Sequence, residues 1–181
     1  MSALPRRILT DWQFSGIAVI QSGSALSIFD GNAGSVYGNF NNRAEATGTN
    51  PLTHGSLFSR IVGTGRYLDA SAFTRAPEAP NGTSLADQDF GDSSVGLVRG
   101  PGQHNLDMAA ERVFPVTEAS SFRFRAEFFN LTNTPQFSNP NTFLGYGDPT
   151  LPNPTASASF GQITSTATNP RIVQFALKYV F

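Results

Sequence analysis

The chain has 181 residues, a net charge of −1, no cysteine and only 14% charged residues. The near-zero net charge argues against nucleic acid as a partner, and the absence of cysteine excludes disulfides, thiolate nucleophiles and cysteine-based zinc sites. Sixteen Phe occur beside 17 Gly and 12 Pro, a composition that predicts aromatic strands separated by polar loops. No stretch approaches the roughly 18 consecutive apolar residues of a membrane helix.

The first predicted strand covers residues 11–21. The segment before it, MSALPRRILTDW, holds a positive pair but no apolar run, so it is not expected to act as a signal peptide. An exported form of this chain would therefore need an export signal from elsewhere. Within the strand, alternate positions form one mostly apolar face, as in a strand with one solvated side: Trp12, Phe14, Gly16, Ala18 and Ile20.

The second predicted strand covers residues 105–114. Leu106, Met108, Ala110 and Phe114 alternate there with polar or small residues. Because Met, Ala and Glu favour helices, an α-helix is the alternative for this segment. Arg112 falls on the apolar side of the alternation, and near a membrane edge its long side chain is expected to reach the interface.

The third and fourth predicted strands, 121–131 and 171–181, are the most strictly alternating. Arg123, Arg125 and Glu127 share one face of the third strand, and four apolar residues share the other. Three charges on alternate positions would cost several kcal/mol in a dry core, so we expect this charged face to meet water. On the fourth strand one face is apolar: Val173, Phe175, Leu177, Tyr179 and Phe181.

The connections between these strands differ greatly in length. A tight turn is predicted near 117–120, whereas two long loops cover 22–104 and 132–170. A short helix is one interpretation of GRYLDASAF, residues 65–73. Alternating strands of about ten residues, with short turns on one side and long loops on the other, are typical of outer-membrane barrels. The alternative from alternation alone is a soluble antiparallel sheet, for example a secreted β-sandwich that binds carbohydrate.

Other candidate sites are weak. Asp87, Asp89 and Asp92 could offer oxygen ligands to Ca²⁺, but their spacing misses the EF-hand pattern and a solvated loop is favoured. His54 and His104 lie far apart in the sequence. The sequence shows no nucleophile elbow and no acid–base pair. We therefore expect neither an enzyme nor a cofactor or metal site.

Six segments, taken together and in this order, resemble the C-terminal end of TonB-dependent outer-membrane receptors. They are SGIAVIQSGSALSI, RYLDASAFTRAP, GLVRGPGQHNLDMAAERVFPV, SFRFRAEFFNLTNTPQFSNP, SFGQI and PRIVQFALKYVF. The closest group is the Oar-like set, which carries an N-terminal carboxypeptidase-regulatory-like domain. The resemblance extends over nearly the whole chain but matches only the last strands of such a receptor. The signal peptide, TonB box and plug domain of that family have no counterpart in these residues.

The resemblance implies an all-β fold, in which the antiparallel strands are the C-terminal end of a transmembrane β-barrel with two long extracellular loops. The location implied is the outer membrane of a Gram-negative bacterium. It also implies energy-coupled uptake of a siderophore, glycan or similar ligand by the parent receptor. Four strands do not close a barrel, so we expect a fragment that is not transport-competent alone.

The same resemblance implies partners and roles. The partners are outer-membrane lipid, the remaining barrel strands, the barrel-assembly machinery, and the TonB complex through the missing plug. Arg123, Arg125 and Glu127 would face the lumen. The alternation that runs from Val173 to Phe181 matches the C-terminal signature that the assembly machinery reads in that family.

Overall fold

The computed structural model describes residues 10–30, 42–62, 65–76, 90–145 and 156–181. The chain forms two compact units. The first unit contains residues 1–21, 103–136 and 166–181, and the second contains residues 22–102 and 137–165. Among the described residues, no helix has the length and apolar character needed to cross a bilayer.

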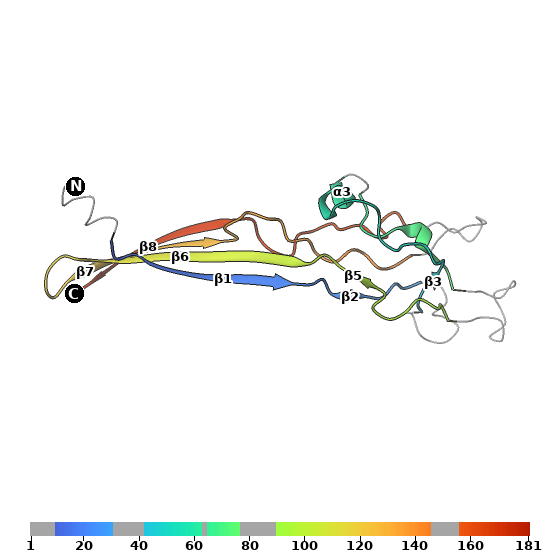
Figure 1. The fold of residues 1–181 in the computed structure, drawn as a ribbon, viewed down its shortest axis with the longest axis horizontal. Helices are drawn as coiled ribbons and strands as arrows, with labels where there is room; N and C mark the ends of the chain where they lie inside the picture. The colour runs from blue at the N-terminus through green and yellow to red at the C-terminus, as the bar shows by residue number, and fades with distance from the viewer. Residues whose placement is uncertain (1–9, 31–41, 63–64, 77–89, 146–155) are drawn as a thin grey trace. The chain divides into compact units, whose positions relative to one another are not determined.

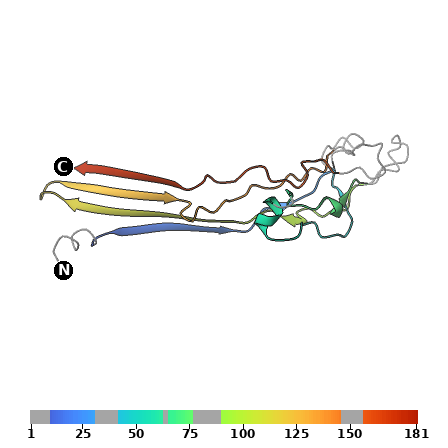
Figure 2. The same cartoon turned by 90° about the horizontal axis from the view of Figure 1, so that it is seen from above.

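The first unit is a single four-stranded antiparallel sheet. Its strands are β1 (Gln13–Gln21), β6 (Gln103–Pro115), β7 (Ser121–Phe129) and β8 (Ile172–Val180), and they lie in the order β1-β6-β7-β8. Figures 1 and 2 show them side by side, from blue β1 to red β8. The all-β antiparallel prediction is confirmed, and the helical alternative for 105–114 is wrong because this segment pairs on both sides.

The register of the sheet keeps like faces together. Phe14 is paired with Ala110, Ala110 with Ala126, and Ala126 with Phe175. Residues paired across antiparallel strands point to the same side of a sheet. One largely apolar face, and an opposite face that carries most of the polar and charged residues, therefore run across all four strands.

The two ends of the sheet are different. At one end, Val116–Ser120 joins β6 to β7, and the amides of Val116 and Thr117 donate to the Ser120 carbonyl at 2.9 and 3.1 Å. This is the tight turn that the sequence predicts, and we call it the hairpin end. At the other end, Gln21 pairs with Gln103 and Phe129 pairs with Ile172. Both long connections leave from this second end, which we call the loop end.

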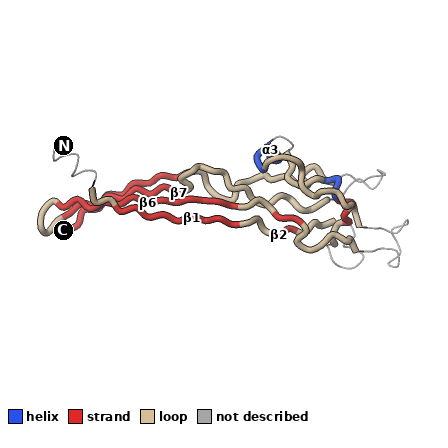
Figure 3. The backbone as a smooth tube through the Cα atoms, viewed as in Figure 1, coloured by secondary structure: helices blue, strands red, loops and turns tan. Residues whose placement is uncertain are grey.

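The second unit shows that the long connections are not structureless. It contains two short antiparallel sheets, β2 (Ala25–Leu26) with β5 (Val98–Arg99) and β3 (Glu45–Ala46) with β4 (Phe73–Thr74). Figure 3 shows the described helices in blue. The helix expected within 65–73 is reduced to the 3-10 turn η1 (Ala70–Ala72), which Asp69 caps. The longer helix, α3 (Leu57–Val62), lies earlier in the chain.

A small hydrophobic core holds the second unit together. Ile28, Leu68 and Phe160 are fully buried, and the rings of Phe73 and Phe160 meet edge to face at 5.9 Å. The Tyr67 hydroxyl donates to the Arg99 carbonyl at 2.8 Å. Burial raises the pKa of Tyr67, and the nearby Arg60 guanidinium acts against that shift. The phenol therefore stays protonated and serves as a donor at neutral pH.

Glycine allows two segments of this unit to touch through their backbones. A Cβ atom on Gly23 would lie 1.8 Å from the carbonyl oxygen of Gly100, which is impossible without a backbone shift. The amide of Gly100 donates to the Ser24 carbonyl at 2.9 Å. The glycine-rich segment that precedes β6 is thus packed against the chain that follows β1.

Candidate functional site

The candidate functional site is the four-stranded sheet itself, because its two faces differ in chemistry. The apolar face is largely uncovered in this chain: Phe14 is 66% exposed, Phe175 69% and Leu177 66%. A soluble protein rarely leaves so large an apolar surface open, and such a surface marks contact with a membrane or a partner. The alternative of a soluble β-sandwich is disfavoured, since its inner face would be covered. The apolar residues on this side of the sheet are Trp12, Phe14, Ala18, Ile20, Leu106, Met108, Ala110, Phe114, Phe122, Phe124, Ala126, Phe128, Val173, Phe175, Leu177 and Tyr179, and Gly16, His104 and Arg112 lie on the same side.

Aromatic rings gather on the apolar face towards the hairpin end. The rings of Phe122 and Tyr179 lie 5.0 Å apart, and Tyr179 continues to Phe181 at 5.9 Å. Trp12 meets the edge of Phe124 at 6.1 Å. Aromatic belts of this kind mark the level of the lipid headgroups in membrane barrels.

Arg112 is the one charged residue within the apolar face of β6. Its guanidinium lies 4.6 Å from the ring centroid of Phe114 and 6.0 Å from that of Trp12. Arg112 is only 6% exposed, so bulk water does not solvate its charge. Cation–π contacts with two rings instead screen its charge from the apolar surroundings.

The polar face carries a charged network that spans two strands. Glu111 on β6 lies 3.5 Å from Arg123 and 3.9 Å from Arg125, both on β7. Arg125 also contacts Glu127 at 2.6 Å. The side-chain amide of Gln174 on β8 donates to Glu127. All four charges remain partly exposed, so each pair contributes at most about 1 kcal/mol.

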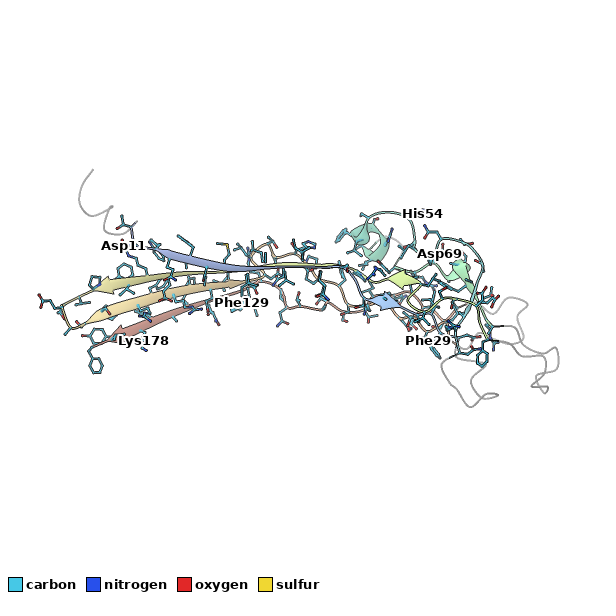
Figure 4. The ribbon with its side chains drawn as sticks, turned by 60° about the horizontal axis from the view of Figure 1, so that its bottom comes forward. Asp11, Phe29, His54, Asp69, Phe129 and Lys178 are labelled. Atoms are coloured by element: carbon cyan, nitrogen blue, oxygen red, sulfur yellow. The ribbon has the colours of Figure 1, made fainter. Side chains whose placement is uncertain are left out.

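A shallow hollow of about 340 Å³ lies on this sheet. Most of its wall is on the polar face, where Arg125 and Glu127 stand beside Asp107, Ser15 and Ile17. Figure 4 shows side chains projecting to both sides of these strands and labels Phe129 and Lys178 on the sheet. Lys178 pairs with Arg123, and Phe129 pairs with Ile172 at the loop end. On β7 and β8 the polar face is therefore charged where Arg123 pairs with Lys178 and apolar where Phe129 pairs with Ile172.

The residues predicted as functional fall into two groups in the structure. Arg123, Arg125 and Glu127 lie together on the polar face, and Glu111 and Gln174 complete their network. Glu111 lies on the polar side of β6 opposite Arg125, and sequence reasoning did not identify it as a partner of these residues. The other group, Val173, Phe175, Leu177 and Tyr179, lies on the apolar face, followed by Phe181, which is 93% exposed.

Among the described residues, the structure does not bring the remaining candidates together. Asp92 accepts a hydrogen bond from the Ala46 amide at 2.8 Å, while Asp87 and Asp89 lie outside the described residues. His54 and His104 belong to different units. Within the part of the chain that the structure describes, no group of three or more His, Cys, Asp or Glu residues is arranged to hold a metal ion.

Comparison with known proteins agrees with this two-faced sheet. A family model described as an outer membrane beta barrel domain matches residues 2–174. The chain belongs to the outer membrane beta barrel domain family, which supports a location in the outer membrane of a Gram-negative bacterium. Searches of curated proteins and of solved structures gave no match.

Substitutions at two neighbouring positions on β8 should show that its two faces contact different media. Phe175→Lys puts a cation on the apolar face near the middle of the strand, and we expect it to lower the stability of the inserted barrel by about 2–4 kcal/mol. Gln174→Lys puts the same cation on the polar face beside Glu127, and we expect a change within about 1 kcal/mol. The measurement is the unfolding free energy in lipid vesicles, and equal losses for the two variants would contradict the assignment of faces.

Proposed function

We propose that this chain forms part of the barrel wall of a TonB-dependent outer-membrane receptor of the Oar-like group. The observation that carries the proposal is the four-stranded sheet with one exposed apolar face and one charged face. In a barrel wall the apolar face meets lipid and the charged face meets a wet lumen. The family match to an outer membrane beta barrel domain supports the same interpretation.

The edges of the sheet indicate that further strands complete the wall. In the described part of the chain, β1 and β8 each pair with one strand only. Backbone N–H and C=O groups on such edges would be unsatisfied in hydrocarbon, at several kcal/mol per group. We therefore infer that remaining barrel strands pair with the outer edges of β1 and β8, and that the four strands alone do not transport a ligand.

The direction of the strands then gives a topology. If β8 ends at the periplasmic side, as in TonB-dependent receptors, the hairpin end is periplasmic and both long connections begin at the extracellular side. Under this topology the residues of the second unit belong to extracellular loops. Their buried core of Ile28, Leu68 and Phe160 would give those loops a fixed shape for contact with a ligand.

Uptake by the parent receptor would depend on a plug domain and the TonB complex. The charged network of Glu111, Arg123, Arg125 and Glu127 would form part of the hydrated lumen wall along which a siderophore, glycan or similar ligand passes. The four side chains carry two positive and two negative charges, so this patch favours no ligand charge. Its function would be to keep the lumen wet without a strong field.

Energy-coupled uptake is tested in the parent organism. We expect deletion of the parent gene to abolish growth on one scarce ligand from a panel of iron chelates and glycans, and deletion of TonB to have the same effect. Restoring the full-length gene should restore growth only when TonB is present. Uptake that continues at the wild-type rate without TonB would contradict the proposed receptor class, although it would leave the barrel assignment standing.

We further propose that the apolar alternation from Val173 to Phe181 is recognised by the barrel-assembly machinery. Phe181 is 93% exposed, so within this chain its ring gains little of the roughly 1.5–3 kcal/mol that burial of a Phe provides. A residue that packs so little is better explained by recognition before the barrel forms. Lys178 lies on the polar face opposite Arg123 and offers a matched position outside that apolar pattern.

In the full-length parent, Phe181→Ala should reduce the amount of protein inserted in the outer membrane by several-fold. The molecules that insert should melt within a few degrees of the wild type, because little packing is lost. Membrane fractionation and a heat-stability gel measure the two quantities, and Lys178→Ala should insert normally. Normal insertion of Phe181→Ala combined with much earlier melting would show that Phe181 is a packing residue only.

A further inference from the structure

The register between β7 and β8 needs a physical cause. A tight turn fixes the register of β6 and β7, but residues 130–171 separate β7 from β8. A loop of that length leaves the register open. A slip of one residue would exchange the two faces of β8, and a slip of two would preserve the faces but misplace every cross-strand pair.

Asn130, directly after β7, binds the chain that enters β8. Its side-chain amide donates to the carbonyl of Asn169 at 3.3 Å and to that of Thr134 at 3.2 Å. Its side-chain oxygen accepts from the Thr134 amide at 3.1 Å. Asn130 is buried and has a φ of +51°, a conformation that Asn adopts more readily than most residues.

Asn133 makes the second contact with the same segment. Its side-chain oxygen accepts from the backbone amide of Arg171 at 3.1 Å, and Arg171 immediately precedes β8. Asn133 also has a positive φ, +50°, and its own amide donates to the Asn130 carbonyl at 2.8 Å. Two side chains from the turn after β7 therefore bind two backbone groups that lie two residues apart.

The turn that carries these two residues is itself fixed to β6. The Asn130 amide donates to the Asp107 carboxylate at 2.8 Å, and the Leu131 amide donates to the Leu106 carbonyl at the same distance. The buried Gln136 side chain forms a reciprocal pair with the backbone of His104, at 2.6 and 2.7 Å. Hydrogen bonds through this turn therefore fix the start of β8 relative to β6.

We propose that Asn130 and Asn133 are positioning residues that set the register of β8 against β7. The two amide side chains fix the register of β7 and β8, as a short turn fixes the register of a hairpin. The proposal rests on the contacts of the sheet alone and is independent of whether the parent is a TonB-dependent receptor.

The chemistry of the two contacts predicts different tolerances. Asn133 uses only its oxygen towards β8, so Asn133→Asp should keep the register. Asn130 uses its NH₂ group to bind two carbonyls, and a carboxylate there would face both without a proton to donate. Asn130→Asp should therefore lose the register. Glycine at either position keeps the positive φ but removes the side-chain bonds, which separates backbone effects from the amide contacts.

Disulfide trapping reads the register directly, because the chain has no cysteine of its own. Arg123 and Lys178 are paired in the native register, so Arg123→Cys with Lys178→Cys should oxidise readily in the inserted full-length protein. Diagonal neighbours are usually too far apart for a disulfide. Arg123→Cys combined with Ala176→Cys or with Val180→Cys therefore reports a slip of two residues in either direction.

With Asn130 and Asn133 unchanged, we expect the cysteine pair at positions 123 and 178 to form far more disulfide than the two diagonal pairs. The Asn130→Gly, Asn133→Gly double variant should raise the ratio of slipped to native disulfide by about tenfold or more, as expected for the loss of the two hydrogen bonds that join the turn to the chain entering β8. Asn169→Ala is the control, because Asn169 accepts the hydrogen bond of Asn130 through its backbone carbonyl. This variant should leave the ratio of slipped to native disulfide unchanged.

An unchanged ratio in the double glycine variant would overturn the proposal. If the double glycine variant does not insert, the aspartate variants test the proposal. The ratio of slipped to native disulfide is then measured on the molecules that insert. The proposal requires slipped disulfides in Asn130→Asp and a native pattern in Asn133→Asp. Equal behaviour of the two aspartate variants would overturn it.

Discussion

The need to pair every backbone amide is the constraint on which the sheet depends. Hydrocarbon offers no hydrogen-bond partners, so a strand crosses a membrane only between two neighbours. In this chain β6 and β7 have both neighbours, while β1 and β8 each have one among the described residues. The same pairing fixes which side chains share a face, and so it determines where lipid and water can lie.

Charged side chains are accommodated differently on the two faces of the sheet. On the apolar face, Trp12 and Phe114 cover the guanidinium of Arg112, so a cation is carried without exposure to lipid tails. On the polar face, Glu111 lies between Arg123 and Arg125, and the charges stay partly hydrated. The partly exposed ion pairs add little stability by themselves, whereas the buried cation–π contacts add more. Each arrangement makes the position of a charge compatible with the medium that the face contacts.

The sequence predicted the strands because each strand's alternation is local. Phe122, Phe124 and Phe128 on one side, with Arg123, Arg125 and Glu127 on the other, suffice to identify β7 as a strand with two different faces. The contact between Glu111 and two arginines required the β6–β7 register, which follows from the turn at Val116–Ser120. Because the sequence predicts this tight turn, the β6–β7 register and the contact of Glu111 with the two arginines could have been predicted from it.

Other features could not be read from the sequence. The packing of Trp12 on Arg112 joins strands that are far apart along the chain, and no local pattern encodes it. The core of the second unit is built from strands of two residues and from single buried side chains such as Ile28 and Phe160. Segments this short show no periodicity, so the sequence predicts only two long loops with a short helix within 65–73.

Accessibility along β7 tests the central claim most directly. Single cysteines would be placed from Phe122 to Phe128 in the inserted full-length protein and treated with a water-soluble thiol reagent. A barrel wall predicts a period of two, in which cysteines at Arg123, Arg125 and Glu127 react, whereas cysteines at Phe122, Phe124, Ala126 and Phe128 are protected by lipid. Equal reactivity along the strand, or protection on both faces, would contradict the assignment of this sheet to a lipid–water boundary.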